Sequence, residues 1–80
     1  MRVEIRYFAS LKDRAGTARD ELDLPERATV QVAVARALEV HPKLVPLRAV
    51  RFARNAELCE PEELLADGDE VALLPPVSGG

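Results

Sequence analysis

Apolar and polar residues alternate along the first stretch of the chain, RVEIRYF (Arg2–Phe8). Val3, Ile5 and Tyr7 share one face of an extended chain, and the opposite face carries charged residues until it ends on Phe8. A period of two is typical of a strand that buries one face. The stretch therefore predicts a half-buried strand whose polar face ends on an aromatic side chain. The following residues, ASLKDRAG, predict one short helical turn at most, closed by glycine.

The same alternation returns in RDELDLP (Arg19–Pro25). Leu22 and Leu24 fall on one face, and the proline ends the strand because it cannot donate to a ladder. We expect this strand to pair with the first one as a hairpin.

The stretch TVQVAVARALEVHP changes to the period of a helix. Thr29 is suited to cap its beginning, and His41-Pro42 is suited to end it. The density of valine and alanine also permits a strand, but the length, the alanines and the His-Pro stop favour the helix. Its apolar positions recur at helical spacing, at Val30, Ala33, Val34, Ala37 and Leu38.

The second half of the chain predicts a loop and three further strands. Residues 43–48 form the loop, and AVRFARN (Ala49–Asn55) and ELCE (Glu57–Glu60) form two strands across a turn at Arg54-Asn55-Ala56. Pro61 in PEELLA suits the first position of a short helical turn. The segment DGDEVALLPP then predicts a turn that leads into a final strand.

The order of these elements predicts an α+β fold. Two hairpin-like pairs flank one helix, and a right-handed crossover through that helix sets the last strand parallel to the first, in the middle of the sheet. The result is a ubiquitin-like β-grasp, with a mixed sheet of four to five strands packed on one main helix. We expect one domain over residues 1–76 and a flexible C-terminal tail over residues 77–80 that ends in Gly-Gly.

The parity of the last strand divides its apolar residues between two faces. If Val71 and Leu73 face the helix with the first strand's apolar residues, then Leu74 points to the open face, as Phe8 does. Apolar groups gathered beside the tail indicate a protein interface. Alternatively, Phe8 caps the edge of the core. The interface prediction covers what we call the apolar patch, namely Phe8, Leu58, Leu74, Pro75 and Pro76.

Composition narrows the function classes. The chain has 80 residues, of which 48% are hydrophobic and 31% charged, with a net charge of −3 and no run of basic residues. These values fit a globular domain and argue against a nucleic-acid partner. No stretch reaches the ~20 apolar residues of a membrane span, and no leader peptide is evident. A lone cysteine fits a reducing compartment, so we expect a cytoplasmic protein.

Candidates for chemistry within the domain are few. We interpret His41 as a helix terminator or a surface residue. We interpret Cys59 as a buried strand cysteine without a base nearby. The residues Asp67-Gly68-Asp69 are typical of a turn. Zinc spacing, a Gly-rich phosphate loop and a Ser/His/Asp set are missing from the sequence. We expect no metal site, no permanently bound cofactor and no autonomous enzyme.

The remaining reactive group is the α-carboxylate of Gly80. A carboxylate becomes an electrophile once adenylation turns one oxygen into a leaving group. From Val77 through Ser78 and Gly79 to Gly80, an extended chain reaches roughly 13 Å, and the glycines add no side chains, so the tail suits a narrow tunnel in a partner. Incidental glycines or an engineered end are the alternative.

The chain resembles the small, sulfur-carrier subunit of molybdopterin synthase, a ubiquitin-like sulfur carrier. The match runs over essentially the whole length, with YFASLKDRAG at the first strand and DGDEVALLPPVSGG at the C-terminus. The double proline before the terminal glycines favours the molybdopterin branch over thiamin-type carriers. Arg54 departs from the family, where an apolar residue is common before the asparagine.

The resemblance implies that a ubiquitin-activating-like adenylyltransferase uses ATP to adenylate Gly80, which sulfur transfer then converts to a thiocarboxylate. The tail inserts into the large synthase subunit of a heterotetramer and donates sulfur to cyclic pyranopterin monophosphate in molybdenum cofactor biosynthesis. Phe8, Leu58 and Leu74 match family positions that contact partners. The alternatives are a sulfur carrier for tRNA thiolation or thiamin, a ubiquitin-like protein modifier, and a purely structural module.

Overall fold

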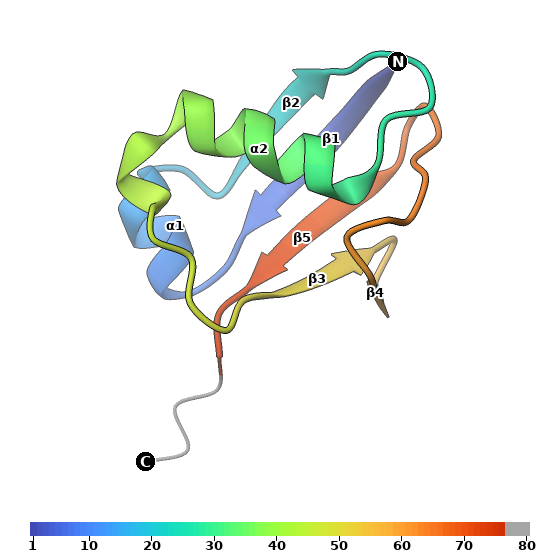
Figure 1. Cartoon of the computed structure of the whole chain (residues 1–80). Coiled ribbons are helices and arrows are strands. Elements are labelled where there is room, and N and C mark those ends of the chain that lie inside the picture. Colours follow the sequence, from blue (N-terminus) through green and yellow to red (C-terminus); the bar gives the residue numbers. More distant parts are fainter. Residues whose placement is uncertain (77–80) are drawn as a thin grey trace.

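A five-stranded mixed sheet is covered on one face by one long helix (Figure 1). The structure is a computed structural model, and it describes residues 1–76. The helical elements are α1 (Ser10–Ala15), α2 (Val30–Val40) and the 3-10 turn η1 (Pro42–Leu44). The strands are β1 (Arg2–Tyr7), β2 (Arg19–Asp23), β3 (Arg51–Arg54), β4 (Glu57–Cys59) and β5 (Glu70–Leu74).

The sheet has the strand order β2-β1-β5-β3-β4. β1 and β2 form the expected antiparallel hairpin, in which Val3 lies opposite Leu22. β5 lies between β1 and β3, parallel to β1 and antiparallel to β3. The predicted β-grasp arrangement, with the last strand in the middle and parallel to the first, is confirmed.

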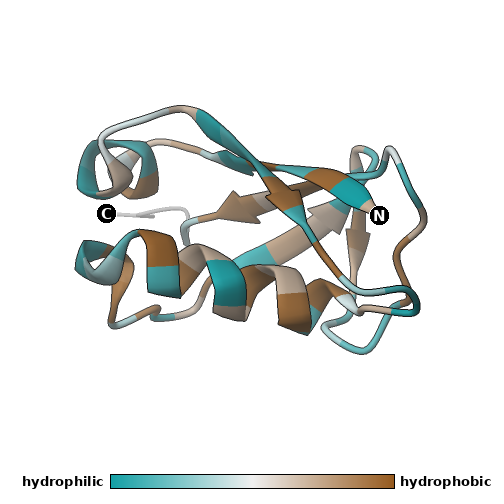
Figure 2. Ribbon diagram, turned by 90° about the horizontal axis from the view of Figure 1, so that it is seen from above, coloured by the Kyte–Doolittle hydropathy of each residue, from teal (hydrophilic) through white to brown (hydrophobic). Residues whose placement is uncertain are grey.

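The helix α2 forms where the apolar spacing predicts it. The Oγ1 atom of Thr29 accepts a hydrogen bond from the backbone N–H of Val32 at 3.4 Å, so the predicted cap is present. Figure 2 shows α2 as a layer along one side of the sheet, with apolar and polar positions alternating along its turns. Its residues Val30, Ala33, Val34 and Ala37 are buried, and Leu38 is half-buried.

The core lies between α2 and the sheet. Val3, Ile5 and Tyr7 of β1 pack there beside Val71 and Leu73 of β5, and all five side chains are almost completely buried. The predicted facing of both strands is therefore confirmed. Burial of this kind stabilises a fold by about 25 cal/mol per Å² of apolar surface removed from water.

The helix α1 is longer than the single turn expected, since it spans six residues, but its end at glycine is confirmed. It follows β1 directly and ends at Gly16, whose backbone adopts the left-handed conformation with φ of 78°. Its Leu11 is buried in the core. Glycine is the residue that adopts this conformation at a helix end without steric cost.

The predicted helical turn at PEELLA is wrong. The segment makes a turn at residues 61–62 and then runs extended, where Leu64 forms an isolated antiparallel bridge with Thr29. The carbonyl oxygens of Pro61 and Glu63 accept hydrogen bonds from the backbone N–H groups of Gln31 and Val30. The first N–H groups of a helix have no partner within it, so the first turn of α2 holds this segment in an extended form.

The predicted loop at residues 43–48 overlaps the turn η1, which buries Leu44 completely. β3 and β4 are confirmed with shorter bounds than predicted. Within residues 1–76, no helix is both long and apolar enough to cross a membrane.

Candidate functional site

The chain leaves the sheet from its central strand. β5 ends at Leu74, and Pro75 and Pro76 follow it. Because proline has no N–H group to donate, the pair ends the ladder at this point. The predicted tail, Val77, Ser78, Gly79 and Gly80, lies outside the described residues. The described part of the chain thus ends just after a strand that is paired on both sides, with β1 and with β3.

Phe8 and Leu74 lie at the same end of the sheet as this exit. The parallel register pairs Tyr7 with Leu73, so the next residue of each strand emerges at one place on the open face. Phe8 is 38% exposed and lies outside the buried core, while Leu74 is half-buried. Phe8 thus lies outside the buried core, and its role at a partner interface stays a prediction.

Leu58 extends the apolar patch across the open face. It lies opposite Ala53 of β3, which in turn lies opposite Ala72 of β5. The two alanines are buried, and Leu58 is 60% exposed. Leu58, Ala53 and Ala72 thus form a row that runs from the edge strand β4 to the central strand β5, which also carries Leu74. Phe8, Leu58 and Leu74 of the predicted patch thus share the open face, whereas Pro75 and Pro76 line a hollow together with residues of α1 and of the loop after η1.

Two arginines border this patch. The guanidinium carbon of Arg6 lies 5.4 Å from the centre of the Phe8 ring, and its Nη1 atom lies 3.8 Å from a carboxylate oxygen of Glu70. Arg51 lies opposite Leu74 in the ladder and is exposed. An arginine over an aromatic face contributes about 0.5–1 kcal/mol at exposed sites. The patch is apolar at its centre and cationic at its border, which suits a protein partner.

A hollow of about 200 Å³ lies at the base of the tail, between α1, the loop after η1 and the two prolines. Arg14 and Arg48 line it. The Nη1 atom of Arg14 donates to the carbonyl oxygens of Leu44 and Pro46, at 3.1 and 3.2 Å. These bonds hold the loop against α1 and so support the exit of the tail.

Arg54, the departure from the family pattern, has charged partners. Its Nη1 atom lies 3.2 Å from Glu63, and its Nε atom lies 3.3 Å from Asp69. The side-chain amide of Asn55 donates to Asp69 at 3.0 Å, and the backbone N–H of Ala66 donates to the same carboxylate at 2.8 Å. Asp69 is buried, and these bonds hold its pKa below the ordinary value. This cluster fixes the turns that precede β4 and β5.

Tyr7, Asp20 and His41 form a second cluster that the sequence did not reveal. The Tyr7 hydroxyl donates to Asp20 at 2.9 Å, and Nε2 of His41 lies 2.6 Å from the same carboxylate oxygen. The Tyr7 and His41 rings pack edge to face at 5.5 Å. His41 ends α2, as predicted, and its side chain is mostly covered, with 18% of it exposed. The cluster ties the end of α2 to β1 and β2.

Burial raises the pKa of Tyr7 above its usual value, and the hydrogen bond to Asp20 adds to this effect. The group is therefore a neutral hydrogen-bond donor and not a base.

Cys59 is half-buried on the helix side of β4, so the expectation of a buried cysteine is only partly met. Burial raises the pKa of its thiol, and the carboxylate of Glu63 raises it further. A raised pKa reduces the thiolate fraction on which nucleophilic attack depends. Among residues 1–76, no three His, Cys, Asp or Glu side chains gather in a way that holds a metal ion.

These features define a class of protein: a ubiquitin-like β-grasp domain with exposed apolar side chains at the end of its central strand. Comparison with known proteins specifies the class further. The model of the ThiS family matches residues 5–80. A molybdopterin synthase sulfur carrier subunit from Chlamydomonas reinhardtii is 36% identical, over 100% of both chains.

Two solved structures agree with this result. The structure of SAMP1, the small archaeal modifier protein 1 of Haloferax volcanii, superposes with a TM-score of 0.92 at 34% identity, over 100% of both chains. A chain of the Helicobacter pylori complex between subunits 1 and 2 of molybdopterin-converting factor gives a TM-score of 0.75 at 29% identity, again over 100% of both chains. The chain belongs to the ThiS family, and its resemblance to molybdopterin synthase sulfur carriers is confirmed.

Proposed function

We propose that this chain is the sulfur-carrier subunit of a molybdopterin synthase. The observation that carries the proposal is the full-length match to curated sulfur carrier subunits of that enzyme, which includes the C-terminal segment. The geometry supports it, because the tail begins at the central strand, next to the exposed Phe8 and the half-buried Leu74. The domain would rest on a partner while the tail reaches a site inside that partner.

The chemistry that we assign to the chain is centred on Gly80. Its carboxylate oxygen attacks the α-phosphate of ATP in the site of an adenylyltransferase, and pyrophosphate leaves. Hydrosulfide (HS⁻) from a sulfur donor then attacks the acyl carbon, AMP leaves, and loss of the S–H proton gives a C-terminal thiocarboxylate. We assign the catalytic groups for both steps to partners, and we expect this chain to be neither an autonomous enzyme nor the holder of a permanent cofactor. We also expect it to act in the cytoplasm.

The partner for sulfur donation is, in this proposal, a large synthase subunit. The Helicobacter pylori structure holds subunits 1 and 2 of a molybdopterin-converting factor together, which supports a pairwise complex of this kind. We propose the apolar patch of Phe8, Leu58, Leu74, Pro75 and Pro76 as the docking surface. Two small and two large subunits would then form a heterotetramer.

The decisive experiment weighs the intact chain. The full-length protein is incubated with its adenylyltransferase, ATP and a sulfur donor, and mass spectrometry should show one terminal oxygen replaced by sulfur. A variant that lacks Gly80 should keep the thermal stability of the unaltered chain and show no such change. An unchanged mass in the presence of an active adenylyltransferase would refute the carrier proposal.

A second candidate function is that of a ubiquitin-like protein modifier. The 34% identity and TM-score of 0.92 with SAMP1 favour it, because that relative is named a modifier. Both functions need an activated Gly80, so its deletion abolishes both. Two readouts separate them: conversion of a pterin precursor by the large subunit supports the synthase, and covalent attachment to lysines of other proteins supports the modifier.

A further inference from the structure

One helix is too narrow to cover this sheet. A helix with its side chains is about 10–12 Å wide, whereas five strands spaced about 4.8 Å apart span about 19 Å. The core packs under α2 mainly from β1, β2 and β5. Figure 1 shows β3 and β4 to one side of the helix. The helix-side face of these two strands is therefore only partly covered.

A hollow of about 420 Å³ lies where α2 leaves this face open. Its helix wall is uncharged and consists of Gln31, Val34, Ala35 and Leu38, which recur at positions i, i+3, i+4 and i+7 of α2. Phe52 of β3 and Pro61 complete the lining. Phe52 points to the helix side, since it lies opposite Leu73 in the ladder, and it is half-buried. The walls are thus predominantly apolar.

A second hollow, of about 450 Å³, continues from the first one. The two share Phe52 and Pro61, and the second adds Leu58 and Cys59 of β4. Together they form one groove, which we call the α2–β3 groove, that runs from the helix to the edge strand. Leu58 borders both this groove and the apolar patch, but the rest of the patch lies on the opposite face or at the tail.

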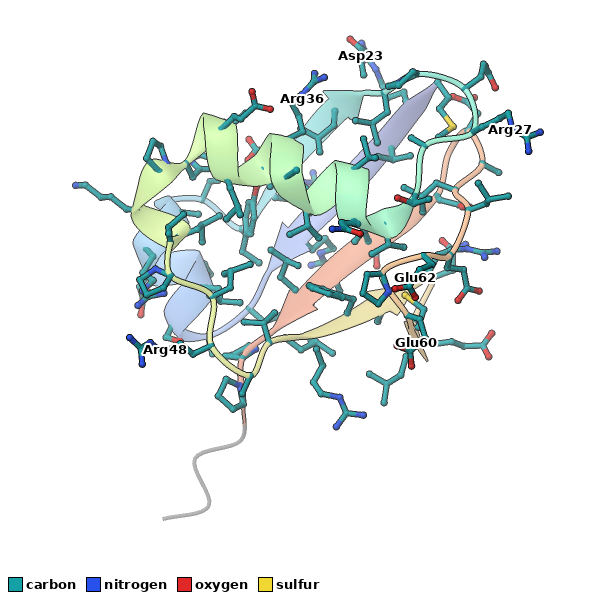
Figure 3. All side chains as sticks on the ribbon, viewed as in Figure 1. Asp23, Arg27, Arg36, Arg48, Glu60 and Glu62 are labelled. Atoms are coloured by element: carbon teal, nitrogen blue, oxygen red, sulfur yellow. The ribbon has the colours of Figure 1, made fainter. Side chains whose placement is uncertain are left out.

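Carboxylates line the rim of the groove. Glu60 and Glu62 are exposed, and Figure 3 shows both on the segment that follows β4. Within residues 1–76, neither of them takes part in an ion pair, whereas the neighbouring Glu63 is paired with Arg54. The one cation of the lining, Arg51, belongs to the second hollow. The rim therefore carries Glu62 at the hollow next to α2, and Glu60 at the second hollow, where Arg51 also lies.

We propose that the α2–β3 groove docks a basic, amphipathic segment of a partner protein. Apolar side chains of the segment fill the space between Leu38, Phe52 and Pro61, and its lysines or arginines pair with Glu60 and Glu62. The apolar walls and the carboxylates together favour a basic segment over an acidic one, because an acidic segment would be repelled by the like charges at the rim. The hollow next to α2 lies on the helix side of the sheet, whereas the second hollow reaches Arg51 and Leu58, which belong to the open face. A segment seated in the hollow next to α2 therefore leaves Phe8 and Leu74 free. The proposal stands independently of the sulfur-carrier function.

The test uses the ¹⁵N-labelled full-length chain and a synthetic helical peptide of leucines and lysines, with the leucines on one face. We expect saturable shifts of the backbone amides of Val34, Ala35, Leu38, Phe52 and Cys59. A peptide with glutamate in place of every lysine should bind at least tenfold more weakly. Binding of the lysine peptide should weaken as salt is added, because rim charges are screened.

Variants locate the site. Glu60→Gln with Glu62→Gln should weaken binding about three- to tenfold, the expected range for two exposed ion pairs. Ala35→Glu places a charge in the helix wall at a position where a helix tolerates glutamate, and it should weaken binding more than tenfold. The matched control, Asp13→Asn with Glu26→Gln, removes two exposed carboxylates elsewhere and should leave the affinity unchanged.

Several results would overturn the proposal. One is an equal loss of affinity in the control variant, which would show that the peptide senses net charge alone. Others are shifts concentrated on the open face of the sheet, equal binding of the two peptides, or no binding of either. The spectra and the melting temperature of each variant show whether it is folded, so a misfolded variant is not counted as a loss of binding.

Discussion

The two faces of β5 differ although they belong to the same five residues. Val71 and Leu73 face α2 and are completely buried. Ala72 and Leu74 face the other way, where no helix covers them, and Leu74 remains half-buried beside the exposed Phe8. One face holds the domain together, and the other is available to a partner. The two faces of this central strand thus differ because α2 covers only one of them.

The largest expected effect on the free energy of unfolding is that of Leu73→Ala, compared with the same change at its neighbour Leu74. Leu73→Ala leaves a cavity in the core and should cost about 2–5 kcal/mol, which is comparable to the total stability of ~3–5 kcal/mol for a domain of this size. Leu74→Ala should cost less than about 1 kcal/mol, because its side chain keeps part of its exposure. Urea unfolding followed by circular dichroism measures both, and equal losses would contradict the division into two faces.

Asp69 tests whether polar groups also stabilise the domain. Asp69→Asn removes charge-assisted hydrogen bonds at the turn before β5 and should cost about 1.5–3 kcal/mol. The folded-state pKa is lowered, chiefly by the Asn55 hydrogen bond. The contribution is therefore present above the ordinary pKa of about 3.9 and lost as the pH falls below it. Thermal melts from pH 7 to pH 2 should show a smaller acid loss in the variant.

A substitution of Tyr7, on the helix-covered face, should change the free energy of unfolding less than the substitution of Asp69. Tyr7→Phe removes one hydrogen bond to Asp20 and should cost about 1 kcal/mol. Because Tyr7 is the one tyrosine in the chain, its ionisation can be followed by absorbance alone. Burial raises its pKa, so the stabilisation is complete below the ordinary value of about 10 and is lost as the pH rises. Tyrosinate absorbance near pH 10 in the folded chain would contradict this.

Phe8 should have the smallest effect on stability. Phe8→Ala removes the contact with Arg6 and should cost less than about 1 kcal/mol, but it should weaken binding to a large synthase subunit by at least about tenfold. Calorimetry with the purified partner and a thermal melt separate the two effects. Val45→Ala, at an exposed position outside the patch, is the control. A large loss of thermal stability with unchanged binding would assign Phe8 to the fold instead.

Most of the strand assignments followed from the sequence because alternation is a local property. Val3, Ile5 and Tyr7 can be assigned to one face without knowledge of any neighbour. The error at PEELLA has a tertiary cause, since the extended form is held by the N–H groups of Val30 and Gln31. Proline at a first helical position is a weak local preference, which such contacts override.

Some residues of the candidate site could also be predicted from the sequence, and others could not. The patch residues Phe8, Leu58 and Leu74 followed from parity and from the family resemblance, and the structure shows where they lie. The sequence did not predict the α2–β3 groove. Leu38 and Phe52 are far apart along the chain, and they line the same groove only because of the way α2 packs across the sheet. The carboxylates at the rim, Glu60 and Glu62, are conspicuous only once that groove is present.

By itself, the sequence determined which segments form strands and which form the main helix, since their apolar residues recur with different periods. It also determined which residues share a strand face, the helix cap at Thr29 and the strand that leads to the tail. Each of these depends on residues a few positions apart, whose relation is set by backbone geometry. Only the tertiary structure decided that Asp20 meets His41 and that Asn55 meets Asp69. Such partners are distant along the chain, and they meet because strand register and helix crossing bring them together.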